Sequence, residues 1–291
     1  MVAKVVRLHY QRVGLPGFLR VLAGWSITLG GLILLTLQVR EAIPADLRSA
    51  LADGTIAAAA TALGALPVLV IRQISQRVQG ALLGFGAGVM LAASMFSLLL
   101  PAFDAAIERG ATGGGAATIV ATGFILGAAL LLALERSVPH IHTPDKQHSV
   151  TAVWLFVIAI AVHNIPEGLA IGVAASESGV SAVATGISLQ NMPEGLIVAI
   201  ALASVGYGRA LSFTVAALSG LIEAVAALIG AAVVHFTAAA LPWGLAAAAG
   251  AMIFVVSHEI IPESHKRGHE TLATVGLIIG FVVMMLLDTL L

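Results

Sequence analysis

The chain has 291 residues, of which 59% are hydrophobic and 10% are charged, and its net charge at pH 7 is −1. Soluble domains have about 25% charged residues, so this chain has too little polar surface to cover a globule in water. The mean hydropathy of +1.03 agrees. The low net charge excludes the basic footprint of a nucleic-acid-binding protein, and the lack of cysteine excludes disulfides and thiolate metal sites. The composition predicts an all-α, polytopic membrane protein.

Nine apolar segments are long enough to cross a bilayer, which takes about 20 apolar residues in a helix. In chain order, the predicted spans are residues 21–39, 55–71, 79–102, 115–134, 151–173, 180–203, 209–236, 243–262 and 271–290. We expect a single transmembrane domain over residues 1–291, with one extra N-terminal span before an eight-helix core at 55–290. The polar stretches, about 40–54, 135–150 and 263–270, are expected to be loops.

The basic residues predict how the chain is oriented in the membrane. With nine spans and a cytoplasmic N-terminus, eleven of the 14 lysines and arginines fall in cytoplasmic segments. This is the bias that the positive-inside rule describes, and it places the C-terminus outside. Without the first span, the basic cluster between Lys4 and Arg20 would lie outside, so the bias also supports nine spans.

Two matching motifs lie in neighbouring predicted spans. The first reads HNIPEG from position 163, and the second reads QNMPEG from position 190. Residues four apart share one face of a helix, so His163 stacks over Glu167, and Gln190 stacks over Glu194. Each motif therefore directs nitrogen and oxygen donors toward one point.

A proline precedes the glutamate in each motif. Pro166 and Pro193 lack an N–H and clash with the preceding turn, so both helices are expected to break or kink there. The carbonyls of Val162 and Leu189 then lose their helical partners. Such freed backbone in a membrane helix is typical of transporter sites that line a cavity.

Three glutamates lie deep within predicted spans, where an ionisable side chain costs at least ~2.5 kcal/mol. They are Glu167, Glu194 and Glu223, and Ser219 lies one turn before the third. Helix-to-helix hydrogen bonding is the alternative role for any one of them, but two motif copies on adjacent spans favour a cation site. One imidazole with several carboxylates and amides suits a borderline ion such as Zn²⁺, whereas Ca²⁺ and Mg²⁺ prefer oxygen ligands alone.

A second polar cluster is expected on the cytoplasmic side. Short His-rich tracts indicate metal binding only weakly, and a solvated loop is the alternative. The candidate relay residues are His140, His142, His148, His258 and Glu259. At the other end of the second core span, Asp104 is either an entrance residue for cations or a helix cap.

The paired motifs, the glutamate-bearing span after them and the His-rich loop resemble the ZIP (Zrt/Irt-like protein) family of metal transporters, in particular its prokaryotic branch. The resemblance covers most of the chain and is strongest over about residues 151–290; residues 90–104 also resemble the second core helix of the family. It implies a site for two ions. The first ion would be held by Met90, His163, Glu167, Gln190 and Glu194, and the second by Asn164, Glu167, Glu194 and Glu223. Asn191 is a further predicted site residue; many relatives have an acidic residue at this position, so the departure removes a potential bridging carboxylate from the site of the second ion.

The resemblance also implies a function. A ZIP protein moves Zn²⁺, and similarly Cd²⁺, Fe²⁺ or Mn²⁺, into the cytoplasm, here across a bacterial inner membrane. It implies an elevator-type motion of the motif helices against a scaffold, a homodimer, and a cytoplasmic relay through His258, Glu259 and the loop histidines. No resident cofactor and no enzymatic activity are expected, since the metal is the cargo.

Two other function classes remain as alternatives. A cation channel or a proton-coupled carrier of another solute would also use buried acids. An intramembrane metalloprotease would need HExxH on one helix face, but His258-Glu259 is followed by Pro262, and the next histidine is His265.

Overall fold

The computed structural model describes residues 43–71, 73–137, 150–175, 181–265 and 270–290. Residues 1–48 and residues 49–291 form two compact units. The predicted span at 21–39 and the loop residues His140, His142 and His148 lie outside the described residues. Within the described ranges the secondary structure is helical throughout, with no strand, which confirms the all-α prediction.

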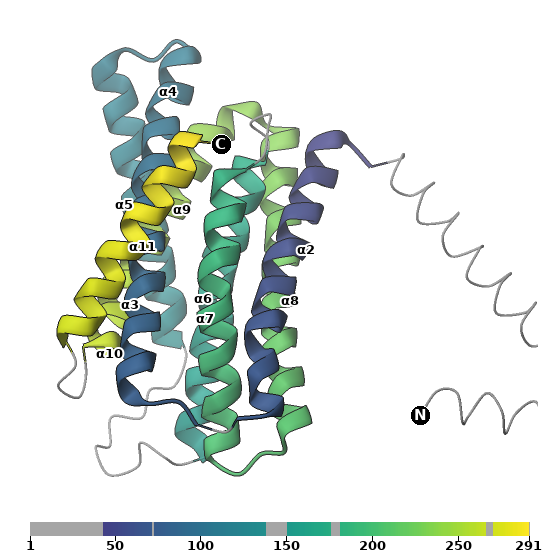
Figure 1. Cartoon of the computed structure of the whole chain (residues 1–291). Helices are drawn as coiled ribbons and strands as arrows, with labels where there is room; N and C mark the ends of the chain where they lie inside the picture. The colour runs from purple at the N-terminus through teal and green to yellow at the C-terminus, as the bar shows by residue number, and fades with distance from the viewer. Residues whose placement is uncertain (1–42, 72, 138–149, 176–180, 266–269, 291) are drawn as a thin grey trace, which may run out of the picture. The chain divides into compact units, whose positions relative to one another are not determined.

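The helices of the described chain are drawn in Figure 1. In order, they are α2 (Ala45–Ala65) with the 3-10 turn Leu66–Leu69, α3 (Gln76–Ala92), a π-helical segment (Ala93–Leu99), α4 (Leu100–Glu108), α5 (Gly113–Ser137), α6 (Val150–Ala174), α7 (Ala182–Ser204), α8 (Arg209–Phe236), the 3-10 turn Ala238–Ala240, α9 (Leu241–Val255), a second π-helical segment (Val256–Ile260), α10 (Ile261–Ser264) and α11 (Glu270–Leu290).

Eight helices in the described part of the chain are long and apolar enough to cross a membrane, which confirms the eight-helix core. The first of these spans begins at Ala45, so the prediction of a loop over 40–54 is wrong from residue 45 onward. The backbone N–H of Arg48 already bonds to the carbonyl of Pro44, and Asp46 lies in the first turn, where a negative charge favours a helix N-terminus. The second span continues to Glu108, beyond the predicted end at 102.

The predicted breaks at the two motif prolines do not occur, and a kink at either one stays a prediction. Helices α6 and α7 continue through Pro166 and Pro193, so neither motif ends a helix. Instead, π-helical turns precede Pro101 and Pro262, which lie in the first turns of α4 and α10. A proline cannot donate to the carbonyl four residues earlier, and π-bulges occur frequently at functional sites.

Glycines divide the described helices of residues 49–290 into two bundles. In the first, which we call the motif bundle, glycines of α2, α6, α7 and α8 face backbone atoms of another helix of the same group. The second, the flanking bundle, comprises α3, α4, α5, α9, α10 and α11 with the two π-helical segments, and its buried glycines likewise face backbone within the group. A Cβ at Gly172 would lie 2.0 Å from the carbonyl oxygen of Ala227, and one at Gly88 would lie 1.9 Å from that of Leu277. Only glycine permits such close backbone contacts.

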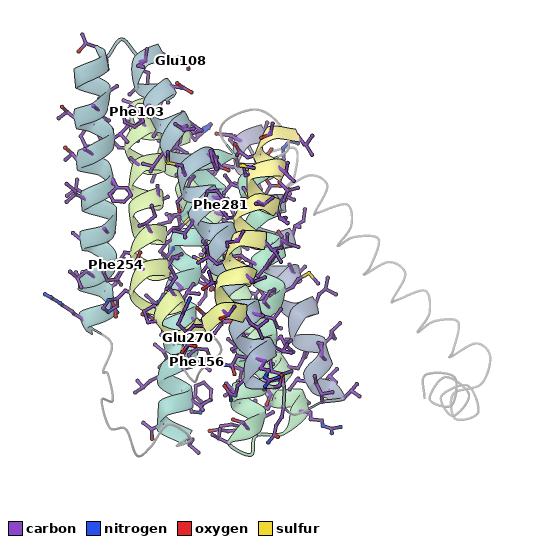
Figure 2. The ribbon with its side chains drawn as sticks, turned by 60° about the vertical axis from the view of Figure 1, so that its left-hand side comes forward. Phe103, Glu108, Phe156, Phe254, Glu270 and Phe281 are labelled. Atoms are coloured by element: carbon purple, nitrogen blue, oxygen red, sulfur yellow. The ribbon has the colours of Figure 1, made fainter. Side chains whose placement is uncertain are left out.

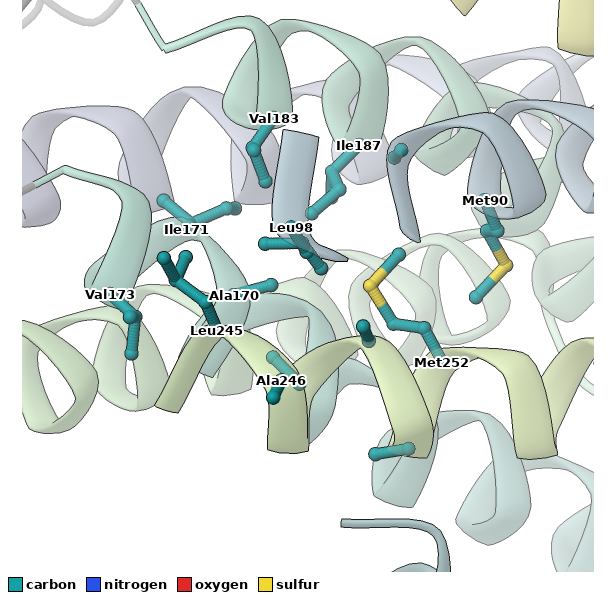
Figure 3. Close-up of a cluster of buried hydrophobic side chains, with 14 of the residues drawn as sticks. Met90, Leu98, Ala170, Ile171, Val173, Val183, Ile187, Leu245, Ala246 and Met252 are labelled. Carbon is teal, nitrogen blue, oxygen red and sulfur yellow. The ribbon is translucent and has the colours of Figure 1, made fainter. Parts of the chain in front are cut away.

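The two bundles meet through side chains instead. A Cβ at Gly186 or at Gly244 would meet only side-chain atoms, those of Met284 and Val89 in the first case and of Val173 in the second. Figure 3 shows the apolar cluster at this interface, where Ala170 and Ile187 of the motif bundle pack near Leu98 and Leu245 of the flanking bundle. The bundles are therefore tightly packed internally and joined by an apolar side-chain layer.

Candidate functional site

A small cavity lies between the two bundles, beside both motifs. Its volume is about 30 Å³, which is enough for one or two water-sized particles. The polar side chains in its wall are His163, Glu167, Gln190 and Glu194, all of them predicted site residues. The rest of the wall is apolar or glycine and comes from α3, α6, α7 and the second π-helical segment: Leu82, Leu83, Gly86, Ile160, Pro193, Ile197 and Ile260.

The two motifs are joined directly by a hydrogen bond. Nε2 of Gln190 donates to Oε1 of Glu167 over 2.5 Å, and both side chains are buried. The spacing of four residues within each motif places these groups on the facing sides of α6 and α7. The sequence prediction that the motifs converge on one point is thus met in the structure.

Several acceptor atoms around this point are buried and lack a hydrogen-bond partner in the described part of the chain. Buried polar atoms are nearly always paired, so a cluster of unpaired acceptors marks a place for a cation or for donors supplied by water. The atoms are Nδ1 of His163, Oδ1 of Asn164, Oε2 of Glu167, Oε1 of Gln190, Oδ1 of Asn191 and Oε1 of Glu194.

Glu223 lies beside the cavity but outside its wall. Nδ2 of Asn191 donates to its Oε2 over 2.5 Å, and Oγ1 of Thr61 lies 3.5 Å from its Oε1. Asn164 is tied to the same helix, since its Nδ2 donates to the carbonyl oxygen of Ser219 over 2.9 Å. Sequence reasoning did not identify Thr61, and a threonine in an apolar helix gives no signal by which it could have been found.

Met90 lies in the apolar core, with 1% of its surface exposed. It is one helical turn beyond Gly86, which does line the cavity, and Figure 3 shows it among apolar side chains. Met90 is not among the described residues in the cavity wall, and its role as a ligand stays a prediction.

Two residues of the predicted cytoplasmic relay, His258 and Glu259, form contacts near the cavity. Nε2 of His163 lies 3.0 Å from Oε1 of Glu259, and Nε2 of His258 lies 3.0 Å from Oε1 of Glu135 at the end of α5. Phe254, labelled in Figure 2, stacks on the ring of His258 at 5.1 Å between centroids. These pairs lead from the cavity toward the C-terminal end of α5.

The protease alternative gains no support from these contacts. His265 caps α10, and its Nε2 lies 3.1 Å from Oγ1 of Thr274 on α11, whereas His258 pairs with Glu135. The two histidines thus have different partners rather than one shared site. Throughout residues 43–137, 150–175, 181–265 and 270–290, apart from Arg72, no three His, Asp or Glu side chains gather closely enough to hold a metal ion by themselves. Any ion must therefore use the amides or draw the carboxylates together.

Two acids lie at the other end of the second core span. Asp104 is exposed on α4, away from the cavity wall, and its entrance role stays a prediction. Asp288 on α11 accepts a short hydrogen bond from Oγ of Ser97 in the first π-helical segment. Asp288 was missed by sequence reasoning, although an acid within an apolar span is itself a signal of function.

Comparisons with known proteins find zinc transporters similar to this chain. Residues 139–288 match the family described as ZIP Zinc transporter. The chain is 47% identical over 252 residues to the zinc transporter ZIPB of Bordetella bronchiseptica, and this match covers 82% of this chain and 80% of that protein. It is 44% identical to the zinc transporter GufA of Myxococcus xanthus, over 80% of this chain and 95% of that protein. The human zinc transporter ZIP11 is 33% identical, over 78% of this chain and 93% of that protein.

Proposed function

Because this chain belongs to the ZIP family of zinc transporters, we propose that it imports Zn²⁺ through the cavity between its two bundles. The observation that carries the proposal is the cluster of unpaired acceptors contributed by the two motifs. His163, Glu167, Gln190 and Glu194 supply one imidazole, two carboxylates and one amide to the wall of this cavity. This thiol-free set suits Zn²⁺ and related borderline ions such as Cd²⁺ and Fe²⁺.

The charge of the buried acids supports a cation as the cargo. Glu167 and Glu223 are each 1% exposed, and no lysine or arginine in the described ranges pairs with either of them or with Glu194. Isolated buried carboxylates are strongly unfavourable in a membrane. A bound divalent ion or bound protons would remove this cost, and the nearby imidazole favours the metal.

The packing supports an elevator-type motion. Close backbone contacts through glycine hold each bundle together, while the interface between them consists of apolar side chains. The apolar layer itself can slide without breaking hydrogen bonds, and the motion would separate His163 of the motif bundle from Glu259 of the flanking bundle. The motif bundle, which carries Glu167, Glu194 and Glu223, would be the moving part, and the flanking bundle would be the scaffold.

The direction of transport is proposed from the orientation that the basic residues predict. With the N-terminus in the cytoplasm of a bacterium, the apolar cluster of Figure 3 lies on the outer side of the cavity. His258 and Glu135 lie toward the inner side. In this orientation, an ion would leave the cavity toward the cytoplasm by way of the predicted relay residues.

Uptake of radioactive zinc into proteoliposomes tests the proposal. We expect His163→Ala to lower the initial uptake rate about tenfold or more, since altering even the partner of a metal-binding histidine costs about tenfold or more. The matched control is His235→Ala, since His235 is exposed at the end of α8. Wild-type uptake by His163→Ala would contradict the proposal, provided that the control and the variant insert equally well.

A further inference from the structure

Asn191 and Glu223 form a pair that leaves no room for a metal ion between them. We infer that this chain carries one divalent cation in its site, because Asn191 binds Glu223 in place of a second ion. The inference rests on the proposed function, and it departs from the two-ion site that the family resemblance implies.

The orientation of the Asn191 amide is fixed by two acceptors. Its Nδ2 donates to Oε2 of Glu223 over 2.5 Å and to the carbonyl oxygen of Ala57 over 3.2 Å. Both amide hydrogens are thus in use, and the side chain is fully buried. Turning the amide to offer its oxygen to an ion near Glu223 would place that oxygen against two acceptors. Each donor lost in this way leaves a buried group unpaired, at about 1–3 kcal/mol.

Glu223 is held in place from several sides. Thr61 contacts its other carboxylate oxygen at 3.5 Å. A Cβ at Gly168 would lie 2.4 Å from the carbonyl oxygen of Glu223, and one at Gly220 would lie 2.9 Å from Cβ of Thr61. The backbones of α6 and α2 therefore press closely on α8 near this residue. These contacts hold the backbone at Glu223, and the hydrogen bonds from Asn191 and Thr61 hold its carboxylate.

Gln190, the corresponding amide at the start of the same motif, is placed differently. Its Nε2 has one acceptor, Oε1 of Glu167, and its Oε1 has no partner within the described chain. Gln190 also lines the cavity. Rotating this amide exchanges a single hydrogen bond for a bond to the ion, so Gln190 can serve as a ligand where Asn191 cannot.

The remaining unpaired oxygens near Glu223 do not make a second site by themselves. Oδ1 of Asn164 and Oδ1 of Asn191 are neutral acceptors. The nitrogen of Asn191 faces Glu223, so its oxygen points away from that carboxylate. An ion at these oxygens would lack the charge of Glu223. Replacing Asn191 by aspartate would instead place two carboxylates together with no N–H between them, and a second cation would relieve their repulsion.

Anomalous diffraction from crystals soaked in Cd²⁺ tests the inference. In the wild type we expect one peak in the cavity at Glu167 and Glu194 and none bonded to Glu223. Asn191→Asp should add a second peak at Glu223, and Asn191→Asp combined with Glu223→Gln should lose it. In detergent solution, Asn191→Asp should bind one more Cd²⁺ per chain than the wild type by calorimetry.

The outcomes separate this inference from the proposed function. A wild-type peak bonded to Glu223 would overturn the single-ion inference and leave zinc import standing. The absence of any wild-type peak in the cavity would count against the proposed function itself. The wild-type crystal alone shows whether an ion is bonded to Glu223. The test therefore does not depend on the folding of Asn191→Asp.

Discussion

Nε2 of His163 lies 3.0 Å from Oε1 of Glu259, so a carboxylate of the flanking bundle holds the imidazole of the first motif. A carboxylate accepts, and we therefore assign the hydrogen to Nε2. The other ring nitrogen, Nδ1, is buried and has no hydrogen-bond partner among the described residues. Histidines that bind metals commonly give their second N–H to a carboxylate. The lone pair of Nδ1 is therefore available to bind an ion.

Glu259→Gln should therefore weaken zinc binding by about tenfold, which is typical when the partner of a metal-bound histidine is altered. The glutamine keeps the size of the side chain and one acceptor but loses the charge. Competition with a zinc-sensitive dye in detergent measures the change, with Glu108→Gln at the exposed end of α4 as the control. Equal affinities for the two variants would show that Glu259 does not orient His163.

Gly168→Ala should destabilise the protein. The added Cβ would lie 2.4 Å from the carbonyl oxygen of Glu223 and 2.8 Å from its Cα, and overpacking of this kind costs roughly 1–3 kcal/mol. Gly114→Ala is the matched control, since a Cβ there meets no atom within 4 Å. Thermal unfolding in detergent should show a lower midpoint for Gly168→Ala only. Equal midpoints would mean that α6 and α8 are less closely packed than described.

A disulfide between the bundles should stop transport. A Cβ at Gly244 lies 3.9 Å from Cβ of Val173, within the range that a disulfide requires, and the chain has no cysteine of its own. We expect Val173→Cys combined with Gly244→Cys to lose zinc uptake on oxidation and to recover it on reduction, because the bundles can no longer slide.

The control for this experiment is a disulfide within one bundle. A Cβ at Gly115 would lie 3.7 Å from Cβ of Ala111. Ala111→Cys combined with Gly115→Cys therefore has a similar Cβ–Cβ distance but does not join the bundles. Oxidation of this pair should leave uptake unchanged. Full uptake by the oxidised 173/244 pair would contradict the elevator-type motion.

The sequence was enough to predict the eight core helices and the meeting of the two motifs. Both follow from local patterns: apolar length sets a membrane span, and a four-residue spacing places His163 with Glu167 and Gln190 with Glu194 on one face. The start of α2 was misjudged because Asp46, Arg48 and Asp53 look like loop residues. In the structure Asp46 instead stabilises the first turn of the helix.

The partners of each polar side chain could not be predicted in the same way. That Asn191 would bind Glu223 and Ala57, or that Thr61 would face the same carboxylate, depends on how close α2, α7 and α8 lie. Those distances are set by glycines that meet backbone of helices far away in the sequence. Residue spacing alone likewise does not predict the π-helical turns before Pro101 and Pro262.

We propose that an ion binds where Glu167 and Glu194 line the cavity. Calorimetric titration of the detergent-solubilised protein with Zn²⁺ tests it most directly, with two double variants matched in charge. One is Glu167→Gln combined with Glu194→Gln. The other is Glu108→Gln combined with Glu270→Gln, at two exposed acids that Figure 2 shows toward opposite ends of the helices. We predict that the first variant binds one Zn²⁺ fewer than the wild type and that the second binds the same number. Equal binding by the first variant and the wild type would contradict the account.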